Sequence, residues 1–562
     1  MSRRALSALG ILLLAGCAAG CRPSSDRAPA ATNAPTPNVP TGIFRDVAAD
    51  AGITFRWGHD GKSPLNIVET IGHGAAFLDY DQDGRLDIFL VGNKRCALFR
   101  NQGDGRFADV TERAGLTAEG MFFGVAVGDY DNDGFPDVYV SGYGKCVLYH
   151  NTGQGGFADV TARAGLGARG KYDVVTAAAF ADLDGDGRLD LFAGRYIVFT
   201  PDSLQFCTYH GVRAGCGVKN YEPDFPRVYR NAGDGRFADV TTKWGFDTSP
   251  GKCLGVAVRA ADRGKGILLY AANDEQPGNL WARQQDGNYK DIGLPSGVAF
   301  GQDGLTQAGM GADWGDFNND QKPDLIVATF QSEVKSLYKS DAENLFTETS
   351  GRLNLAATTA HVSWTARFFD FDNDGWLDLF FTNGHVQDNV HLIQADRTYA
   401  QPLQLFRNEN GSVFREMKAE GGAAFTHNIV GRGAAFGDYD NDGRVDVLVV
   451  NEEGPPLLLH NESRGANQHW LGVRLIGAGR GSNRDGIGAR VTVSAGTKRL
   501  TRDAQLAGGY LSAHDPRVHF GLGETTRVDK IEVRWPDGAT ETRRNVVADQ
   551  YVTVAQRKGK PR

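Results

Sequence analysis

The sequence predicts an all-β protein, built as a seven-bladed β-propeller and followed by a small β-sandwich-like domain. Three observations support this prediction. An acidic nine-residue motif and an aromatic strand motif both recur along the chain, and they keep step at a spacing of about 50 residues. Glycine is frequent, at 73 of 562 residues, and this suits short strands joined by tight turns.

The acidic motif reads Asp-x-Asp-x-Asp-Gly-x-x-Asp and lies between short apolar runs such as 74–77 and 88–91. These runs favour β-strands, so we expect each copy to be the turn of a hairpin between two buried strands. Six copies occur, and the one that begins at Asp316 is degenerate, with Asn318 and with Gln321 in place of glycine. The unit between Phe237 and Tyr289 keeps a strand but has a short turn at 262–266 instead.

The aromatic motif predicts how the ring of blades closes. Its copies begin at Phe44, Phe107, Phe157, Phe237, Tyr289, Phe346 and Phe414. No copy follows the last acidic motif, whereas a spare copy at 44–47 precedes the first. We therefore expect 44–47 to form the outer strand of the last blade. Ring closure would remove sheet edges that are prone to aggregation.

The acidic motif has the composition of an oxygen-ligand cation site. Calcium takes about six to eight oxygen ligands, and carboxylates at positions 1, 3, 5 and 9 with a backbone carbonyl at position 7 supply such a shell. The glycine at position 6 permits the sharp turn. We therefore predict about six structural Ca²⁺ sites. Their ligands are Asp79, Asp81, Asp83, Arg85, Asp87, Asp129, Asp131, Asp133, Phe135, Asp137, Asp182, Asp184, Asp186, Arg188, Asp190, Asp316, Asn318, Asp320, Lys322, Asp324, Asp370, Asp372, Asp374, Trp376, Asp378, Asp438, Asp440, Asp442, Arg444 and Asp446.

Two alternative interpretations exist for these loops. An EF-hand needs a Glu at position 12, but apolar residues such as Leu90 and Val140 occupy it in every copy. Solvated turns are the other alternative, because Asp and Gly are common in turns. Recurrence in register favours metal, and the loop at 316–324 is expected to be the weakest site.

The N-terminus has the pattern of an export signal. Arg3 and Arg4 precede an apolar run at 5–15, which is too short to span a bilayer of about 30 Å. The run ends in Leu14-Ala15-Gly16-Cys17, which resembles the lipobox of bacterial lipoproteins, whose cysteine is acylated. An ordinary cleaved signal is the alternative. We predict a signal at residues 1–17 with lipidation at Cys17, and a flexible tether at 18–42. The predicted location is the bacterial cell envelope, at the outer membrane.

Export also sets the redox environment of the cysteines. Five lie in the folded region, so at least one thiol is left over. Cys207 and Cys216 are close in sequence, within a long insertion, and are the best candidates for a disulfide. The pairing of Cys96, Cys146 and Cys253 is left open.

Further motifs resemble a known family. The acidic loops and their flanks resemble FG-GAP repeats, as in integrin α-chain propellers. Residues 206–217 and 383–386 resemble bacterial relatives of cartilage acidic protein. Residues 486–489, 519–523 and 534–538 resemble the ASPIC/UnbV domain of those proteins. The resemblance implies a propeller at 43–464, an ASPIC/UnbV-like β domain at 465–556 and a tail at 557–562. It also implies extracytoplasmic calcium binding and a role in adhesion or ligand recognition.

Two functions are compatible with this sequence. The first is non-enzymatic recognition of a protein or glycan, with one rim of a central funnel formed by Glu69, His73, Tyr172, Asp173, His361, Trp364 and His427. The same residues could instead be ordinary packing and turn residues. The second is a carbohydrate-active enzyme, a polysaccharide lyase or hydrolase, for which His385 and His391 are the nearest candidates. No catalytic motif stands out, so we expect a binding protein. The net charge of -8 argues against a nucleic-acid partner.

Overall fold

The computed structural model describes residues 42–57, 63–261, 266–463 and 468–557. The predicted signal, Cys17 and all but the last residue of the tether lie outside this part, as do 262–265 of the short turn. The described residues form one compact unit. No helix among the described residues is long and apolar enough to cross a membrane.

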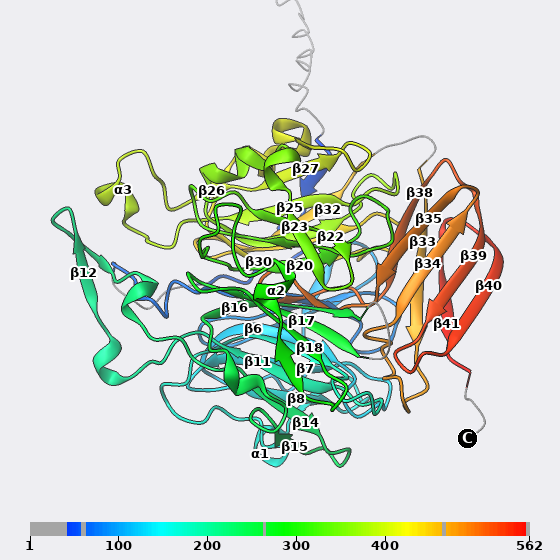
Figure 1. Ribbon diagram of the computed structural model, residues 1–562, viewed down its shortest axis with the longest axis horizontal. Coiled ribbons are helices and arrows are strands. Elements are labelled where there is room, and N and C mark those ends of the chain that lie inside the picture. Colours follow the sequence, from blue (N-terminus) through cyan, green and yellow to red (C-terminus); the bar gives the residue numbers. More distant parts are fainter. Residues whose placement is uncertain (1–41, 58–62, 262–265, 464–467, 558–562) are drawn as a thin grey trace, which may run out of the picture. The chain divides into compact units, whose positions relative to one another are not determined.

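Within residues 42–57, 63–261 and 266–463, seven sheets each have four consecutive antiparallel strands, and two further strands extend the first of these sheets (Figure 1). Their strands are, sheet by sheet, β2 (Ala75–Leu78), β3 (Asp87–Leu90), β4 (Ala97–Asn101) and β5 (Phe107–Asp109); β6 (Met121–Gly128), β7 (Asp137–Tyr143), β8 (Val147–Asn151) and β9 (Phe157–Asp159); β10 (Val175–Ala181), β11 (Asp190–Arg195), β14 (Arg227–Asn231) and β15 (Phe237–Asp239); β16 (Cys253–Ala260), β17 (Ile267–Asn273), β18 (Asn279–Arg283) and β19 (Tyr289–Asp291); β20 (Ala312–Gly315), β21 (Asp324–Val327), β22 (Ser336–Ala342) and β23 (Leu345–Glu348); β24 (Ser363–Phe369), β25 (Asp378–Asn383), β27 (Gln404–Asn408) and β28 (Phe414–Glu416); and β30 (Gly431–Gly437), β31 (Asp446–Asn451), β32 (Leu457–Asn461) and β1 (Phe44–Asp46).

The first strands of these sheets contact one another in a closed cycle: β2, β6, β10, β16, β20, β24, β30 and back to β2. This is the arrangement of propeller blades around an axis, and it confirms the all-β propeller prediction. Small residues dominate these inner strands, as in the run Ala177–Ala179 of β10, because the strands converge on the axis and leave little room.

The last sheet is completed by the N-terminal strand. Phe44 of β1 pairs with Asn461 of β32, and Asp46 pairs with Leu459. The prediction that 44–47 supplies the outer strand of the last blade is confirmed. Because the first and last segments of the propeller share one sheet, neither can leave without breaking it.

The C-terminal region forms two sheets around its own core. One contains β38 (Val518–Gly523), β33 (His469–Ile476) and β41 (Gln550–Ala555). The other contains β35 (Lys498–Asp503), β34 (Arg490–Ala495), β39 (Arg527–Arg534) and β40 (Thr540–Val547). Leu471, Val491, Phe520 and Val533 belong to one buried cluster that both sheets share. The predicted β-sandwich-like domain is confirmed.

A loop of this C-terminal region enters the centre of the propeller. Its two short strands, β36 (Ala507–Gly508) and β37 (Ser512–Ala513), extend the sheet of β2. Between them, Gly509 and Ala312 exchange two backbone hydrogen bonds of 2.8 and 3.0 Å, and Leu511 accepts one of 3.0 Å from Val125. We call residues 507–513 the plug. The plug occupies the channel, so a ligand site at the predicted funnel is limited to its rims and stays a prediction.

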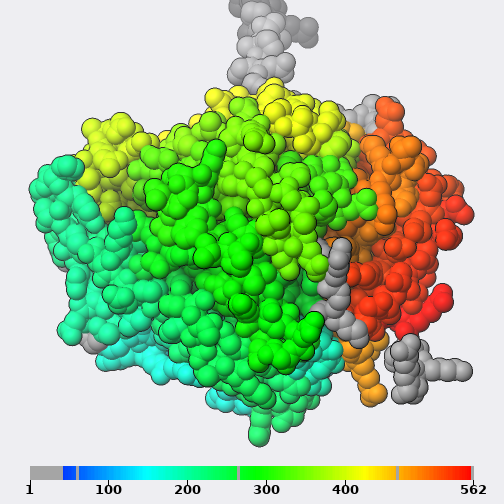
Figure 2. Space-filling view, viewed as in Figure 1, coloured from blue at the N-terminus to red at the C-terminus, as the bar shows by residue number. Residues whose placement is uncertain are grey.

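Two insertions project from the blades on the side away from β33–β41 (Figure 1). One is the hairpin of β12 (Phe206–Tyr209) and β13 (Val212–Gly215), and the other contains α3 (Val390–Ile393). The Asn389 side-chain amide donates to the Arg213 carbonyl at 2.8 Å. The two insertions form one continuous surface (Figure 2). Minor elements are α1 (Thr161–Ala164), α2 (Gly293–Ser296), β26 (Gln401–Pro402) and β29 (Asn428–Ile429).

Candidate metal loops and channel mouth

All six acidic motifs are hairpin loops between the first two strands of a blade, as predicted. The ninth residue of each motif is the first residue of the second strand. These residues are Asp87, Asp137, Asp190, Asp324, Asp378 and Asp446. The loops therefore have no helix on either side, which excludes an EF-hand arrangement.

Hydrogen bonds within each loop fix the shape of the turn. In the loop 129–137, the Asp129 carboxylate accepts the backbone N–H groups of Asp133 at 3.0 Å and Gly134 at 2.8 Å. Asp133 in turn accepts the N–H of Phe135 at 2.8 Å. In every loop the backbone N–H at position 7 donates this bond to the Asp at position 5. The donors belong to Arg85, Phe135, Arg188, Lys322, Trp376 and Arg444.

The ninth residue ties the loop to the blade. The Asp137 carboxylate accepts the N–H of Tyr130 at 3.2 Å and the N–H of Asn151, on the third strand, at 2.8 Å. The other five ninth residues each accept two equivalent backbone N–H groups, one from the loop and one from the third strand. These residues are Asp87, Asp190, Asp324, Asp378 and Asp446. Each oxygen keeps a second lone pair, so these bonds leave the carboxylate able to bind a cation.

The donor set fits a hard cation such as calcium. Carboxylate oxygens of Asp79, Asp81 and Asp87 lie within 4.8 Å of one another, as do those of Asp129, Asp131 and Asp133. Buried oxygens without a hydrogen-bond partner occur in these loops, at Oδ1 of Asp79, Asp81 and Asp372. An unsatisfied buried acceptor is costly, and a bound cation would satisfy it.

Burial and mutual repulsion affect the acidity of these groups. Burial, opposed by hydrogen bonds and reinforced by neighbouring carboxylates, raises the pKa of Asp87 and of Asp446 to about 8. Burial likewise raises the pKa of Asp137 to about 7 and that of Asp316 to about 6. Without a cation, several loop carboxyl groups therefore hold a proton more readily than free aspartate does.

A basic side chain on the third strand lies beside five of the loops. Arg100 contacts Asp81 at 2.6 Å and Asp83 at 2.8 Å, and His150 contacts Asp137 at 3.1 Å. Arg230, Arg407 and His460 occupy the same position in their blades. In the degenerate blade, Lys339 instead pairs with Asp341 at 3.3 Å. In three loops a second basic side chain, Arg85, Arg188 or Arg444 at position 7, contacts the Asp at position 5. Where they are charged, these side chains reduce the repulsion between the loop carboxylates.

Sequence reasoning overlooked a recurrent asparagine that joins neighbouring blades. The side-chain amide of Asn151 donates to the carbonyl of Tyr80, at position 2 of the preceding loop, at 2.8 Å. Asn101, Asn231, Asn408 and Asn461 do the same to Tyr439, Tyr130, Phe317 and Phe371. In the blade without an acidic loop, the Tyr289 hydroxyl donates to Leu183 at 2.9 Å instead. The sequence carried a signal for this contact: an Asn recurs two residues after an apolar or aromatic residue of the third strand.

The seven residues predicted to line a funnel are not brought together. Trp364 lines a cavity at the mouth of the channel. His73 pairs with Glu452, Asp173 pairs with Arg195, and Glu69 accepts the N–H of Asn66. His361 uses its carbonyl to accept from Lys335, Tyr172 lies against Lys171, and His427 is exposed. Of the two candidates for catalysis, His385 lines the same cavity as Trp364, whereas His391 lies in α3.

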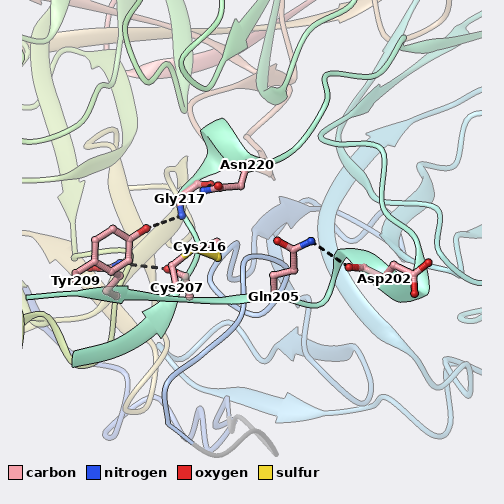
Figure 3. Close-up of a disulfide and its surroundings, with 9 residues drawn as sticks. Asp202, Gln205, Cys207, Tyr209, Cys216, Gly217 and Asn220 are labelled. Atoms are coloured by element: carbon pink, nitrogen blue, oxygen red, sulfur yellow. Dashed lines mark hydrogen bonds between the residues drawn. A yellow bond between two sulfur atoms is a disulfide. The ribbon is translucent and has the colours of Figure 1, made fainter. Parts of the chain in front are cut away.

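The predicted disulfide is present between Cys207 and Cys216, across the β12–β13 hairpin (Figure 3). The Tyr209 hydroxyl beside it accepts the N–H of Gly217 at 3.0 Å. Cys96, Cys146 and Cys253 are free and buried. Burial raises the pKa of the Cys96 and Cys253 thiols to about 12, so we expect them to be unreactive.

Two family models match the chain. One, described as FG-GAP-like repeat, matches residues 79–140, 129–193, 316–381 and 370–449, and each match spans two successive acidic loops. The other, described as ASPIC and UnbV, matches residues 479–561. The unmatched interval between 193 and 316 contains the blade without an acidic loop.

Known proteins share part of this chain. Cartilage acidic protein 1 of Xenopus tropicalis is 27% identical over 303 residues, and that of Homo sapiens is 27% identical over 299. Each match covers 51% of this chain and about two fifths of the relative, 42% and 41% respectively. A solved structure of BBS1N in complex with ARL6DN has a TM-score of 0.40 at 10% identity, covering 75% of this chain and 98% of that one. A TM-score this low supports no argument.

Proposed function

The chain combines FG-GAP-like repeats with an ASPIC and UnbV domain and is homologous to cartilage acidic protein 1, and from this we propose its function. We propose that it is an exported, calcium-loaded propeller that serves recognition or adhesion outside the cytoplasm. Lipid attachment at Cys17 would hold it on the outer membrane of a bacterial envelope. We propose that it acts by binding and not as an enzyme.

The observation that carries the calcium proposal is the convergence of carboxylate oxygens in successive blades. In three loops, the oxygens of at least three acidic residues lie within 4.8 Å of one another. Residues at positions 1, 3, 5 and 9 would hold the ion, with the carbonyl at position 7. Calcium would supply positive charge to clusters that now have basic side chains such as Arg85 and Arg100 beside them. Its role would be structural, because the ligands close the hairpin turn of the blade.

Two independent observations support export. The disulfide in the β12–β13 hairpin is of a kind that persists in oxidising compartments. The lipobox-like segment ending at Cys17 supports lipid attachment. Mass spectrometry of the mature N-terminus tests it: we expect a diacylated or triacylated Cys17, and an unmodified N-terminus beyond Cys21 would contradict it.

Calcium removal tests the central proposal. We expect the purified chain to retain about six calcium ions and chelation to lower the unfolding temperature by many degrees, because a ligand that binds only the folded state stabilises it. Magnesium should restore little, since it demands octahedral geometry and keeps its waters. Asp133→Ala should lower the unfolding temperature more than Asp320→Ala, because the loop of Asp320 lacks the glycine and one carboxylate. An unchanged melt after chelation would mean that the loops are solvated turns.

A further inference from the structure

Three segments cover the end of the channel opposite the C-terminal sheets and enclose a cavity of about 200 Å³. They are residues 65–71, the disulfide hairpin and residues 385–389. The Leu65 N–H donates to the Asp388 carboxylate at 3.1 Å, and Asn389 holds the hairpin. We call this cavity the mouth pocket. Its apolar and aromatic lining includes Ile71, Leu254, Met310, Phe330 and Trp364, and His385 also lines it.

The plug lies directly behind two residues that line the mouth pocket. The ring of Tyr510 packs against Trp364 with centroids 5.0 Å apart, and its hydroxyl donates to the Ile71 carbonyl at 2.9 Å. Both partners also line the pocket. A molecule that enters would be held in a mostly apolar cavity, which is the usual form of a small-molecule site.

The charged groups of the pocket are all acidic. Among the described residues that line it, Asp274, Glu275 and Glu333 are carboxylates and none is Lys or Arg. Asp274 accepts the Tyr196 hydroxyl at 2.6 Å, and Glu333 accepts the N–H groups of Ala308 and Phe330, both at 3.2 Å. Glu275 differs, because its Oε2 is buried and has no hydrogen-bond partner.

The backbone of Glu275 has an unfavourable conformation. Its φ is +52°, in the left-handed region that non-glycine residues rarely adopt, and its N–H donates to the Gln307 carbonyl at 3.0 Å. Strain of this kind is concentrated at functional positions. The exposed Lys219 lies 3.8 Å from the other oxygen of Glu275, which is a weak, screened contact.

Two lysines behind the wall compensate this charge only in part. Lys252 donates to the Val218 carbonyl at 2.9 Å, and Lys335 donates to the His361 carbonyl at 2.7 Å. Burial lowers the pKa of Lys335 to about 7, so its charge is incomplete at neutral pH. Burial also raises the pKa of Asp274 to about 7, so its negative charge is likewise incomplete at neutral pH. Glu275 and Glu333 are the other two carboxyl groups of the pocket.

A buried histidine adds an unused hydrogen-bond donor. His385 is 3% exposed, and its Nδ1 accepts the N–H of Gln387 at 3.0 Å. This contact assigns the ring proton to Nε2, which has no partner. Burial, together with the nearby Arg432, lowers the pKa of His385 to about 4, so the ring is neutral at physiological pH. Two residues that line the pocket thus each hold one unpaired polar atom, a donor in His385 and an acceptor in Glu275.

We propose that the mouth pocket binds a small organic amine that also carries a hydrogen-bond acceptor. The ammonium group pairs with Glu275 and the acceptor takes the His385 Nε2–H. The apolar body lies among Leu254, Met310 and Phe330. This inference goes beyond the proposed function and does not depend on calcium or on the cellular location.

Calorimetric titration of the calcium-loaded full chain tests this with three matched probes. Tyramine has an ammonium and a phenol oxygen, phenethylamine lacks the oxygen, and tyrosol replaces the ammonium by a neutral hydroxyl. We expect tyramine to bind best, phenethylamine more weakly and tyrosol least. Glu275→Gln should weaken tyramine binding roughly tenfold, because it replaces a charge-assisted contact by a neutral one.

His385→Leu should weaken tyramine more than phenethylamine, and the exposed Glu119→Gln is the matched control that should change neither. Glu275 is only half-buried, so its variant should fold, and a thermal melt in calcium checks this. Absence of amine binding at millimolar concentration, equal binding of tyramine and tyrosol, or unchanged affinity in a folded Glu275→Gln variant would each overturn the proposal.

Discussion

The side-chain amide of Asn373 donates to the carbonyl of Gly443 at 3.0 Å and so joins the acidic loops of two neighbouring blades. In four other loops the side-chain amide at position 4 donates in the same way to the carbonyl at position 6 of the next loop. The donors are Gln82, Asn132, Asn319 and Asn441. Asn441, in the last loop, donates to Gly84 in the first loop. The third loop has Gly185 at this position, and the next blade has no acidic loop for it to reach. The series is interrupted only where a partner loop is lacking.

Asn373→Gly should lower the free energy of unfolding by about 1 kcal/mol through the loss of a buried hydrogen bond. Glycine accepts the left-handed φ of +57° at this position, so the change does not add backbone strain. His519 keeps its 3.1 Å contact with the Gly443 carbonyl, which limits the loss. Urea denaturation in excess calcium measures the effect.

The matched control is Asn410→Gly, at an exposed residue with a φ of +55° outside the acidic loops. Both variants place the same glycine in the same conformation, so the difference between them isolates the bond between blades. Equal losses in the two variants would show that the contact between Asn373 and Gly443 contributes nothing.

Gln321→Gly should stabilise the protein. Gln321 has a φ of +70° where the other five loops have glycine with φ between +85° and +104°. A side chain in this region costs about 1–2 kcal/mol, and glycine removes most of that cost. Gln321→Ala keeps the Cβ atom and should bring no gain. If thermal melts show no difference between the two variants, the loop at 316–324 is not strained.

Calcium-free protein should become more stable as the pH falls from about 9 to about 5. The folded state holds the pKa of Asp87 and Asp446 at about 8, whereas the ordinary value is 3.8. Between these values the folded state binds protons that the unfolded chain does not, so lowering the pH favours folding. Excess calcium, which competes with the protons, should flatten or reverse the trend. Denaturation midpoints in both conditions would decide; a calcium-free form more stable at pH 8.5 than at pH 6 would contradict this.

The repeat was enough to predict most of the architecture. The acidic motif marks the turn between the first two strands of a blade, because its carboxylates cap the backbone N–H groups of that turn. The spare motif at Phe44 predicted ring closure, since a missing strand at one end and an extra one at the other have one simple solution. The short spacing of Cys207 and Cys216 in a hairpin insertion identified the disulfide.

The contents of the channel could not be predicted from the repeat. The plug comes from residues 507–513, far from the blades in sequence, and its contacts are mostly through the backbone. Gly74 shows the constraint: a Cβ atom there would lie 1.8 Å from the Leu511 carbonyl oxygen. A glycine before an inner strand is not distinctive in a chain with 73 of them. The binding of a ligand at the predicted funnel rim stays a prediction, and the plug limits such a site to the ends of the channel.

Tyr510→Ala should be the most damaging single change in the plug. Tyr510 is fully buried, and its removal leaves a cavity beneath Trp364 and an unpaired Ile71 carbonyl. Loss of a buried aromatic side chain costs about 3–5 kcal/mol. Tyr510→Phe removes only the hydroxyl and should cost about 1 kcal/mol. Urea denaturation of both variants in calcium measures these losses, and proteolysis within 504–515 reports whether the plug leaves the channel. Both losses below about 0.5 kcal/mol, with no new cleavage, would show that the plug does not stabilise the propeller.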